Sequence, residues 1–225
     1  MKKMKKIALM FALLVTSLSA NAQYDPGTWS MQVKFGFGAS QLTNMDKIPL
    51  SDSNADSQFK GASMIGVDVQ YQVAKRFGLQ FGINHWWQGS GWENFVEDNV
   101  KFEDNKFALD YIAVPVLANF YVVKGLALKT GVQLGYLIDA DVEMTAKAKV
   151  DNYKVTNITS IDVEDDCKKF DVSIPVGISY ETSSDWIFGA QYNIGLTKVN
   201  KESYEGIKDS KNGVFMFTVG WKFKL

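Results

Sequence analysis

Apolar residues alternate with polar or small residues through eight segments of the chain. In the segment 29–38, every second residue from Trp29 to Phe37 is apolar, and the residues between them are Ser, Gln, Lys and Gly. A repeat of two residues puts successive side chains on opposite faces of a β-strand. The same alternation marks 65–73, 77–84, 112–120, 126–136, 170–179, 186–195 and 215–223. Because no segment after residue 22 has the period of an amphipathic helix, the pattern predicts an all-β protein.

The links between these strands alternate in length. Residues 74–76, 124–125 and 183–185 are short enough for hairpin turns, whereas 41–62, 89–106, 141–169 and 199–212 are long and polar. An even number of strands, with short turns at one end and long loops at the other, is the plan of an outer-membrane barrel. We therefore expect an eight-stranded antiparallel transmembrane up-and-down β-barrel.

A soluble sandwich or lipocalin-like cup would also have alternating strands. A soluble barrel and a membrane barrel differ in their polar face. In a soluble barrel this face points to water and must be rich in charge, whereas in a membrane barrel it points to the interior. Here the second face consists of Gly, Gln, Asn, Ser and a few Asp and Lys residues, which suits a crowded polar interior better than a solvated surface. The apolar face runs about ten residues per strand, which matches a tilted membrane crossing. The composition therefore favours the membrane barrel.

Aromatic residues concentrate near the ends of the predicted strands, as expected for the two interfaces of a bilayer. One predicted girdle lies near the short turns and contains Trp29, Phe77, Trp186, Trp221 and Phe223. The other lies near the long links and contains Trp86, Trp87, Tyr111, Tyr136 and Phe170.

Six charged residues fall on the polar face of their strands: Lys34, Asp68, Lys129, Asp171, Glu181 and Lys222. Closing the barrel brings them into one narrow interior, where unpaired charges are costly to desolvate. We expect at least some of them to form cross-barrel ion pairs, with Lys129–Asp171 or Lys34–Asp68 favoured because each pair belongs to neighbouring strands. The alternative is that charges near the mouth are only hydrated. An interior of eight strands is just wide enough to be filled by its own side chains, so open diffusion is not expected.

The first 22 residues have the features of a secretory signal peptide. Four lysines precede an apolar run from Ile7 to Val15, and Ala20-Asn21-Ala22 forms a small-x-small cleavage site. A retained anchor is the alternative, but the apolar run is short for a spanning helix. We predict a signal peptide over 1–22, an outer-membrane β-barrel domain over 23–225, and outer-membrane localisation with the long loops outside the cell. Residues 23–225 carry 20 basic and 25 acidic side chains, which argues against nucleic acid as a partner.

The central part of the chain resembles a known family. The sequence DYIAVPV at 110–116, the hairpin Lys124-Gly125 and LKTGVQLGY at 128–136 are similar to the central signature of the PorT-like outer-membrane β-barrel family, often labelled porin family proteins. The resemblance implies a small barrel of the OmpX and OmpA type, no catalytic residues, and for some members a part in a secretion or gliding apparatus. The final residue, Leu225, departs from the terminal aromatic that commonly ends such barrels.

The segments 110–116 and 170–176 also resemble each other, and each carries a proline in its strand, Pro115 and Pro175. Proline lacks the donor that a strand ladder needs. We therefore expect a bulge or irregularity at each proline that bends the strand into the curvature of the barrel.

Few residues could carry enzyme or metal chemistry. With one His and one Cys, the chain has no His-rich or multi-thiolate metal centre and no internal disulfide framework. The segment 52–56 has the first oxygen ligands of a calcium loop but not its glycine or its bidentate glutamate, and 164–166 is an acidic run beside two lysines. His85 lies in a predicted girdle, and Cys167 lies in a predicted loop. We expect no catalytic residue, cofactor or metal.

Three classes of function remain, together with a fourth, narrower possibility that rests on the resemblance. A non-enzymatic barrel with a structural or surface-interaction role fits the long loops, whose partners would be lipopolysaccharide, outer-membrane lipid and surface or periplasmic proteins. Such a barrel also requires the outer-membrane assembly machinery. The alternatives are narrow transport of a small or apolar solute, a lipid-modifying enzyme, and, from the resemblance alone, an accessory of a secretion apparatus.

Overall fold

The computed structural model describes residues 25–44, 57–97, 100–150, 153–202 and 209–225. The predicted signal peptide at 1–22 and the calcium-like segment at 52–56 lie outside the described residues. The described chain consists of strands and one short 3₁₀ helix: β1 Trp29–Leu42, β2 Ser57–Gln58, β3 Lys60–Ala74, β4 Phe77–Trp92, β5 Phe95–Glu97, β6 Val100–Val123, β7 Leu126–Val150, β8 Tyr153–Asp162, η1 Glu164–Asp166, β9 Phe170–Glu181, β10 Trp186–Gly195 and β11 Asn212–Lys224. Within these residues no helix has the length and hydrophobicity of a membrane-spanning helix.

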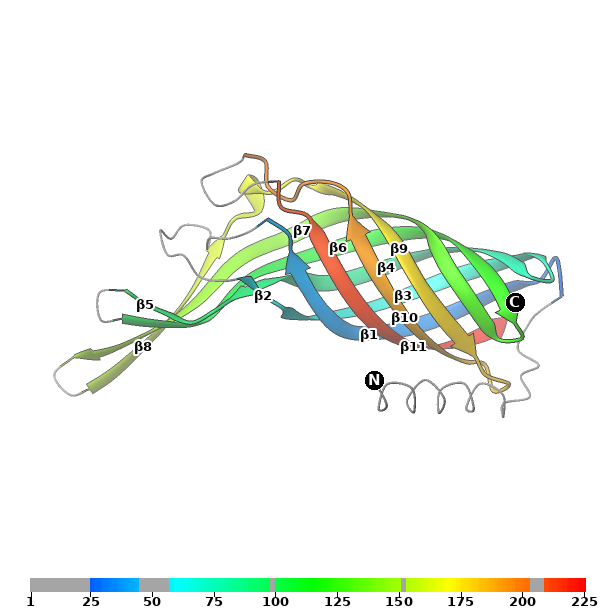
Figure 1. Ribbon diagram of the computed structural model, residues 1–225, viewed down its shortest axis with the longest axis horizontal. Coiled ribbons are helices and arrows are strands. Elements are labelled where there is room, and N and C mark those ends of the chain that lie inside the picture. The colour runs from blue at the N-terminus through cyan, green and yellow to red at the C-terminus, as the bar shows by residue number, and fades with distance from the viewer. Residues whose placement is uncertain (1–24, 45–56, 98–99, 151–152, 203–208) are drawn as a thin grey trace, which may run out of the picture.

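Eight strands form a closed ring (Figure 1). The order of neighbours is β4-β3-β1-β11-β10-β9-β7-β6, and a further β4–β6 pairing closes the circle. Every pairing in the ring is antiparallel. Closure leaves no open edge in the wall, which a membrane-spanning sheet requires. The predicted eight-stranded antiparallel barrel is therefore confirmed.

The short turns gather at one end of the ring, where the C-terminus also lies (Figure 1). They are Lys75-Arg76 between β3 and β4, Lys124-Gly125 between β6 and β7, and residues 182–185 between β9 and β10. Gly125 adopts φ 79°, a left-handed conformation that glycine takes without a steric cost and that suits a two-residue hairpin. We call this end the turn end and the opposite end the loop end.

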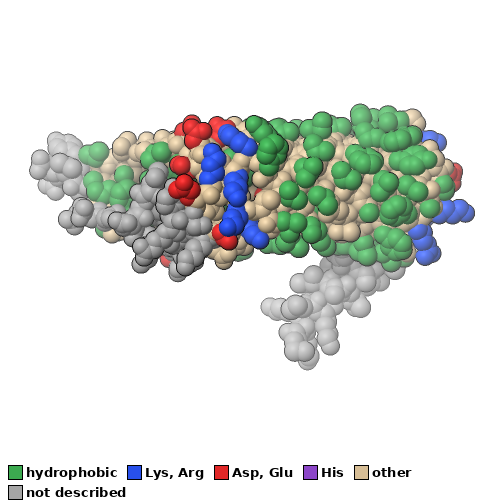
Figure 2. Space-filling model, turned by 90° about the horizontal axis from the view of Figure 1, so that it is seen from above, with side chains coloured by type: hydrophobic (Ala, Val, Ile, Leu, Met, Phe, Trp, Pro, Cys, Tyr) green, Lys and Arg blue, Asp and Glu red, His purple; other side chains and the backbone are tan. Residues whose placement is uncertain are grey.

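The two faces of the wall differ as the alternation predicts. Outward side chains on the ring are mostly apolar and exposed, including Phe35, Phe37, Ile65, Phe81, Ile83, Val114, Leu134, Val176, Phe188, Ile194 and Phe217. Figure 2 shows hydrophobic side chains over the barrel wall and a group of acidic and basic side chains beside them at the loop end. Inward positions are polar and buried, among them Gln32, Gln70, Gln80, Asn119, Gln133, Ser173 and Asn193.

Two members of the predicted girdles point inward, which corrects the prediction. Trp86 is 1% exposed and Tyr111 is 3% exposed. Trp86 continues the inward series of Gln80 and Asn84 on β4, and the Tyr111 hydroxyl reaches Asn212 across the interior. Proximity to a strand end does not decide the face of a residue, because adjacent positions point in opposite directions.

Of the other eight girdle residues, Phe77 is only partly exposed. The remaining seven are exposed on the outer surface: Trp29, Trp87, Tyr136, Phe170, Trp186, Trp221 and Phe223. Several pair across strands. Tyr136 and Phe170 make an edge contact with ring centroids 5.3 Å apart, and Trp186 stacks on Trp221 at 6.4 Å.

At the loop end the strands run further than the sequence indicated. β6 has 24 residues and β7 has 25, and the short β5 and the ten-residue β8 pair with their outer parts. Much of 89–106 and 141–169 is therefore strand rather than loop, which corrects the prediction. The four strands β5, β6, β7 and β8 form a sheet that projects beyond the ring, visible at the left of Figure 1. We call this sheet the extension.

Each proline coincides with an irregularity in the ladder, as one form of the prediction had it, but not with a bulge. Between β4 and β6, pairing passes from Phe81↔Val116 to Asn84↔Ala113 in unchanged register, so the gap lies at Pro115. Pairing between β7 and β9 likewise skips Pro175. Each proline keeps its partner on the other side, Gln133 and Asn193 respectively, and this second ladder holds the register. The missing N–H removes a bond but inserts no extra residue.

Candidate functional site

The interior near the turn end contains a continuous network of charges and amides. Lys34 on β1 pairs with Asp68 on β3, with Nζ and Oδ2 2.7 Å apart, which is one of the two pairs expected from the sequence. Gln80 on β4 donates its Nε2–H to Asp68 Oδ2 at 2.7 Å, and its Oε1 accepts from Lys129 Nζ at 3.0 Å. The sheet register explains the first contact, because Gln32 lies opposite Asp68 and Lys34 is two residues away on the same face.

A second ion pair joins Lys222 on β11 to Glu181 on β9, with Nζ and Oε2 2.7 Å apart. The two side chains are 2% and 4% exposed. They reach each other over β10, which lies between their strands. The sequence analysis placed both residues inside and expected ion pairs among the interior charges, but it did not name this pair because it favoured neighbouring strands.

The predicted Lys129–Asp171 pair is wrong. Lys129 lies opposite Gly177 on β9, whereas Asp171 lies opposite Gly135, six residues further along β7. At about 3.3 Å per residue, roughly 20 Å of strand separates them. Asp171 instead accepts hydrogen bonds from Thr197 Oγ1 at 3.0 Å and Asn212 Nδ2 at 3.2 Å.

Amide side chains extend the network toward the turn end. Gln70 Nε2 donates to Tyr121 Oη at 2.8 Å and to Gln72 Oε1 at 3.0 Å. Asn119 Nδ2 donates to Gln70 Oε1 at 3.0 Å and to Gln80 Oε1 at 2.9 Å. These residues were not singled out from the sequence, although their place on the small and polar face was the available signal.

Glycines on the wall leave the space that these side chains fill. A Cβ at Gly82 would lie 1.9 Å from Asp68 Oδ1, and a Cβ at Gly66 would lie 1.8 Å from Asn84 Oδ1. A cavity of about 10 Å³ lies among Gln32, Lys129 and the surrounding wall. That volume holds about one water molecule. The side chains therefore plug this half of the interior.

The half of the interior nearer the loop end contains a hydrophobic cluster, in which Met64, Trp86, Leu109, Leu137 and Met216 are almost fully buried. Buried polar residues such as Asp171 and Asn212 lie in the same half. The interior thus has a polar network toward the turn end and a mainly apolar layer above it.

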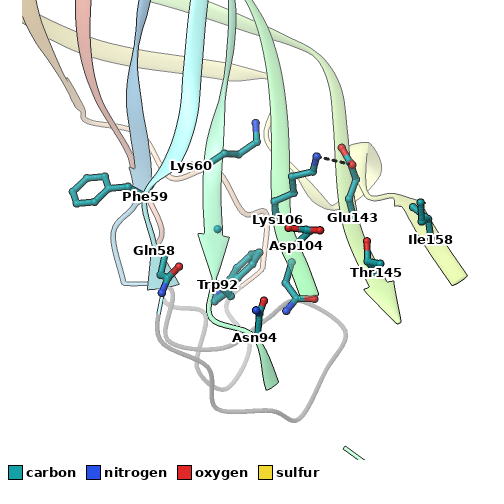
Figure 3. A pocket seen from close by; sticks show the side chains of 12 residues that line it. Gln58, Phe59, Lys60, Trp92, Asn94, Asp104, Lys106, Glu143, Thr145 and Ile158 are labelled. Atoms are coloured by element: carbon teal, nitrogen blue, oxygen red, sulfur yellow. Dashed lines mark ion pairs between the residues drawn. The ribbon is translucent and has the colours of Figure 1, made fainter. Parts of the chain in front are cut away.

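A second site is a cleft of about 480 Å³ at the loop end, lined by residues from β2, β3, β4, β6, β7 and β8. It forms where β4 leaves β6, because their pairing ends at Gly91↔Lys106. On β6 the register shifts between Glu103 and Lys106, and Asp104 adopts φ 54°. Figure 3 shows Gln58, Lys60 and Trp92 on one side and Lys106, Glu143 and Thr145 on the other.

Contacts within the protein fix the polar groups of this cleft. Lys106 Nζ lies 2.9 Å from Glu143 Oε2, drawn as a dashed line in Figure 3. Lys60 Nζ donates to the carbonyl oxygen of Gln88 at 2.9 Å. Asn105 Nδ2 donates to the carbonyl oxygen of Glu93 at 3.2 Å and so holds the segment between β4 and β5 against β6. The sequence reasoning missed this cleft, because its residues lie in segments interpreted as loops.

The extension carries its own ion pairs further out. On β6, Glu103 pairs with Lys101 and with Lys147 of β7. Hydrogen bonds from Lys101 and then Lys147 lower the pKa of the Glu103 carboxyl to about 2, because they stabilise its ionised form.

His85 and Cys167 are the one histidine and the one cysteine of the chain, residue types suited to reactive chemistry, and both pack against neighbouring side chains. His85 Nε2 lies 3.7 Å from Asp110 Oδ2, and its ring lies 4.0 Å from that of Trp87. No hydrogen bond joins His85 to a serine in the part of the chain that the structure describes. Cys167 is buried beside Val163 and Val199, and burial raises the pKa of its thiol to about 12.

Groups of three or more His, Cys, Asp or Glu side chains able to hold a metal ion are absent from the described ranges. The acidic run at 164–166 forms the short helix η1, in which Glu164 pairs with Lys169.

Several solved structures match this chain at low sequence identity. Ail of Yersinia pestis, in complex with the heparin analogue sucrose octasulfate, is 12% identical over 87% of this chain and 99% of its own, with a TM-score of 0.43. Neisserial surface protein A is 14% identical over 87% of this chain and 97% of its own, with a TM-score of 0.43. OprG of Pseudomonas aeruginosa is 13% identical over 89% and 98%, also with a TM-score of 0.43.

No curated protein matches the chain in sequence. The family described as outer membrane protein beta-barrel domain matches residues 21–201. This match spans most of the chain and agrees with the closed ring, the apolar outer wall and the polar interior. The chain therefore belongs to the outer membrane protein beta-barrel domain family and is a β-barrel protein of the outer membrane.

Proposed function

We propose that the chain is a non-enzymatic surface barrel whose extension contacts another protein. The observation that carries this proposal is the continuation of β6 and β7 beyond the apolar wall into a sheet with an open edge at β8. Within the described residues, the named pairing of β8 is with β7 alone. A row of free backbone donors and acceptors on an ordered strand can accept an added strand from a partner.

The sequence of β8 supports strand addition. Residues 155–161 read VTNITSI, with five β-branched residues and no charge, proline or glycine. Natural proteins usually protect such an edge with charges, proline or bulges. Val155 is 48% exposed and Ile158 is 73% exposed, so apolar side chains remain available to a partner. We expect that partner to be a polypeptide that presents an extended, mainly uncharged segment.

Site-specific photocrosslinking on intact cells tests this proposal. A photoreactive residue at Thr156 on β8 should yield an adduct with a distinct protein, whereas one at Val132 on the exposed apolar wall should not. Val155→Lys adds a charge to the edge and should remove the adduct without changing barrel formation. Equal adducts at both positions, or persistence of the adduct in Val155→Lys, would contradict strand addition.

The proposal includes the surroundings of the barrel. The apolar wall and its exposed aromatic residues suit outer-membrane lipid, with lipopolysaccharide at the loop end if that end faces outward. Insertion would use the outer-membrane assembly machinery. The turn end would then face the periplasm, as the alternation of short and long links predicts.

Two other functions remain as alternatives. Narrow transport is disfavoured by the side chains that plug the interior, and planar-bilayer recordings should show negligible single-channel current. The resemblance of 110–116 and 128–136 to the PorT-like family supports an accessory role in secretion. Deletion of the gene with measurement of exported cargo tests that role, since a surface-contact protein should leave export unchanged.

A further inference from the structure

We propose that the loop-end cleft is a binding site for a neutral, hydroxyl-rich ligand, namely a short segment of an uncharged oligosaccharide. This site goes beyond the protein contact proposed for the backbone edge of β8, because it is a cleft that opens where β4 leaves β6, to which β8 contributes only Ile158. Its volume of about 480 Å³ lies within the range of about 300–1,000 Å³ that small-molecule sites occupy.

The charges of the cleft cancel. Lys60 and Lys106 face Asp104 and Glu143, and the closest opposite charges, on Lys106 and Glu143, already pair at 2.9 Å. An anionic ligand would meet two carboxylates, and a cationic ligand would meet two ammonium groups. The electrostatics therefore favour a neutral ligand, whose binding should change little with salt.

The remaining polar groups are amides and a hydroxyl, from Gln58, Asn94, Asn105 and Thr145. Amide and hydroxyl groups both donate and accept hydrogen bonds, which matches the dual character of a sugar hydroxyl. The Trp92 indole is almost fully buried in the wall of the cleft (Figure 3), and the exposed Ile158 supplies apolar surface beside it. Polar groups that fix orientation among apolar side chains are the usual composition of a small-molecule site.

Two buried polar atoms among the lining residues have no hydrogen-bond partner in the described part of the chain. They are Trp92 Nε1, a donor, and Asn105 Oδ1, an acceptor. Unsatisfied buried groups of this kind are few in native proteins, and each needs an explanation. A hydroxyl can satisfy either one, although both atoms are enclosed and a small side-chain movement must admit the ligand.

The backbone of β6 also departs from an ordinary strand at this point. Asp104 is a non-glycine residue with φ 54° inside β6, at the register shift between Glu103 and Lys106. Left-handed residues in element interiors cost free energy and concentrate at functional sites. Here the bulge directs Asp104 and Asn105 to the cleft instead of continuing the alternation of β6.

Two glycines provide a matched pair of variants. A Cβ at Gly91 on β4 would meet its nearest atom, the carbonyl oxygen of Gln58, at 3.6 Å, so a Cβ fits there without a clash, and Gly91 lines the cleft. A Cβ at Gly61 on β3 would meet nothing within 4 Å, and Gly61 does not line the cleft. Gly91→Leu should fill the site, whereas Gly61→Leu makes the same change outside it.

The purified full-length barrel in detergent should first be screened on an array of neutral and sulfated glycans. The strongest neutral oligosaccharide should then be titrated by fluorescence and calorimetry at low and high salt. We expect saturable binding that is unchanged in Gly61→Leu, at least about tenfold weaker in Gly91→Leu, and insensitive to salt. Both variants should fold like the wild type, so that in detergent gels the unboiled protein migrates differently from the boiled protein.

Three outcomes would overturn the proposal. They are the absence of saturable binding by every neutral glycan up to about 10 mM, equal affinity in Gly91→Leu and the wild type, and salt-sensitive binding of sulfated glycans alone. If Gly91→Leu does not fold, Asp104→Asn replaces it, since asparagine tolerates the left-handed conformation and removes only a charged acceptor. Unchanged affinity and salt response in Asp104→Asn would then count against the site. Failure of glycan binding leaves the photocrosslink at Thr156 unaffected, so the two proposals fail independently.

Discussion

The buried Lys222–Glu181 pair allows a double-mutant cycle inside the barrel. Nζ and Oε2 lie 2.7 Å apart, and the side chains are 2% and 4% exposed. The second carboxylate oxygen, Oε1, has no hydrogen-bond partner among the described residues. Lys222→Met would therefore leave a buried carboxylate without its ammonium partner, and Glu181→Leu would leave a buried ammonium without its carboxylate.

The magnitude follows from the distance and the burial. At 2.7 Å and an effective dielectric constant of about 20, the Coulomb attraction is about 6 kcal/mol. Desolvation of two ions offsets most of this attraction, so the intact pair contributes little net stability. Removing Lys222 or Glu181 takes this attraction away from the remaining buried charge, which still bears its desolvation cost. We expect each single variant to lose about 3–5 kcal/mol and the double variant to lie within about 2 kcal/mol of the wild type.

Urea unfolding from lipid vesicles, followed by tryptophan fluorescence, measures these free energies. The exposed Lys198–Asp209 pair serves as the control, and its coupling should stay below about 1 kcal/mol because solvent screens it. If the losses of the two single variants at Lys222 and Glu181 add to that of the double variant within about 0.5 kcal/mol, the two charges do not interact and the reasoning fails.

Three further predictions concern the loop end and the orientation. Because burial raises the Cys167 pKa from 9.0 to about 12, maleimide at pH 8 should modify the folded protein about 10³-fold more slowly than the urea-unfolded chain; equal rates would place the thiol in solvent. Carbon NMR of the Glu103 carboxyl should give a titration midpoint near pH 2. The stabilisation of the extension by ionised Glu103 is therefore present above about pH 4.5 and is lost as the pH falls toward 2. Lys147→Gln should raise the midpoint, and an unchanged midpoint would contradict the pairing of Glu103 with Lys147. Protease added to intact cells should cleave only at the loop end. If a cysteine introduced at Lys75 is labelled by an impermeant reagent on intact cells, the turn end faces outward and the predicted orientation is wrong.

The ring could be predicted from the sequence because alternation and link length are local properties. In the segments 29–38 and 126–136, each residue's face follows from its parity, so inward Lys34 and Lys129 were assigned correctly. Parity could not predict which charges meet. The pairing of charges depends on register and strand tilt. The register places Asp171 opposite Gly135, six residues along β7 from Lys129, whereas Lys222 reaches Glu181 across an intervening strand.

The loop end was less predictable for a different reason. Outside the bilayer a strand needs no continuous apolar face, so the outer parts of β6 and β7 are too polar to stand out by hydrophobic pattern. Trp86 and Tyr111 were assigned to the surface by type, although the apolar layer of the interior also needs large side chains. The cleft depends on a register shift at Asp104, which no local pattern indicated.

β6 and β7 stay paired from the turn at Lys124-Gly125 into the extension, with three register shifts along the way, and this has a mechanical consequence. Their hydrogen bonds lie perpendicular to the strands, and pairing continues from Val123↔Leu126 out to Lys101↔Lys147. A pull along the strand direction on β8 would load its ten pairs with β7 together in shear, rather than opening them one after another. The load would then pass through β7 into a wall that closes on itself. A cell tethered through this strand would hold against tension with the strength of many bonds acting at once.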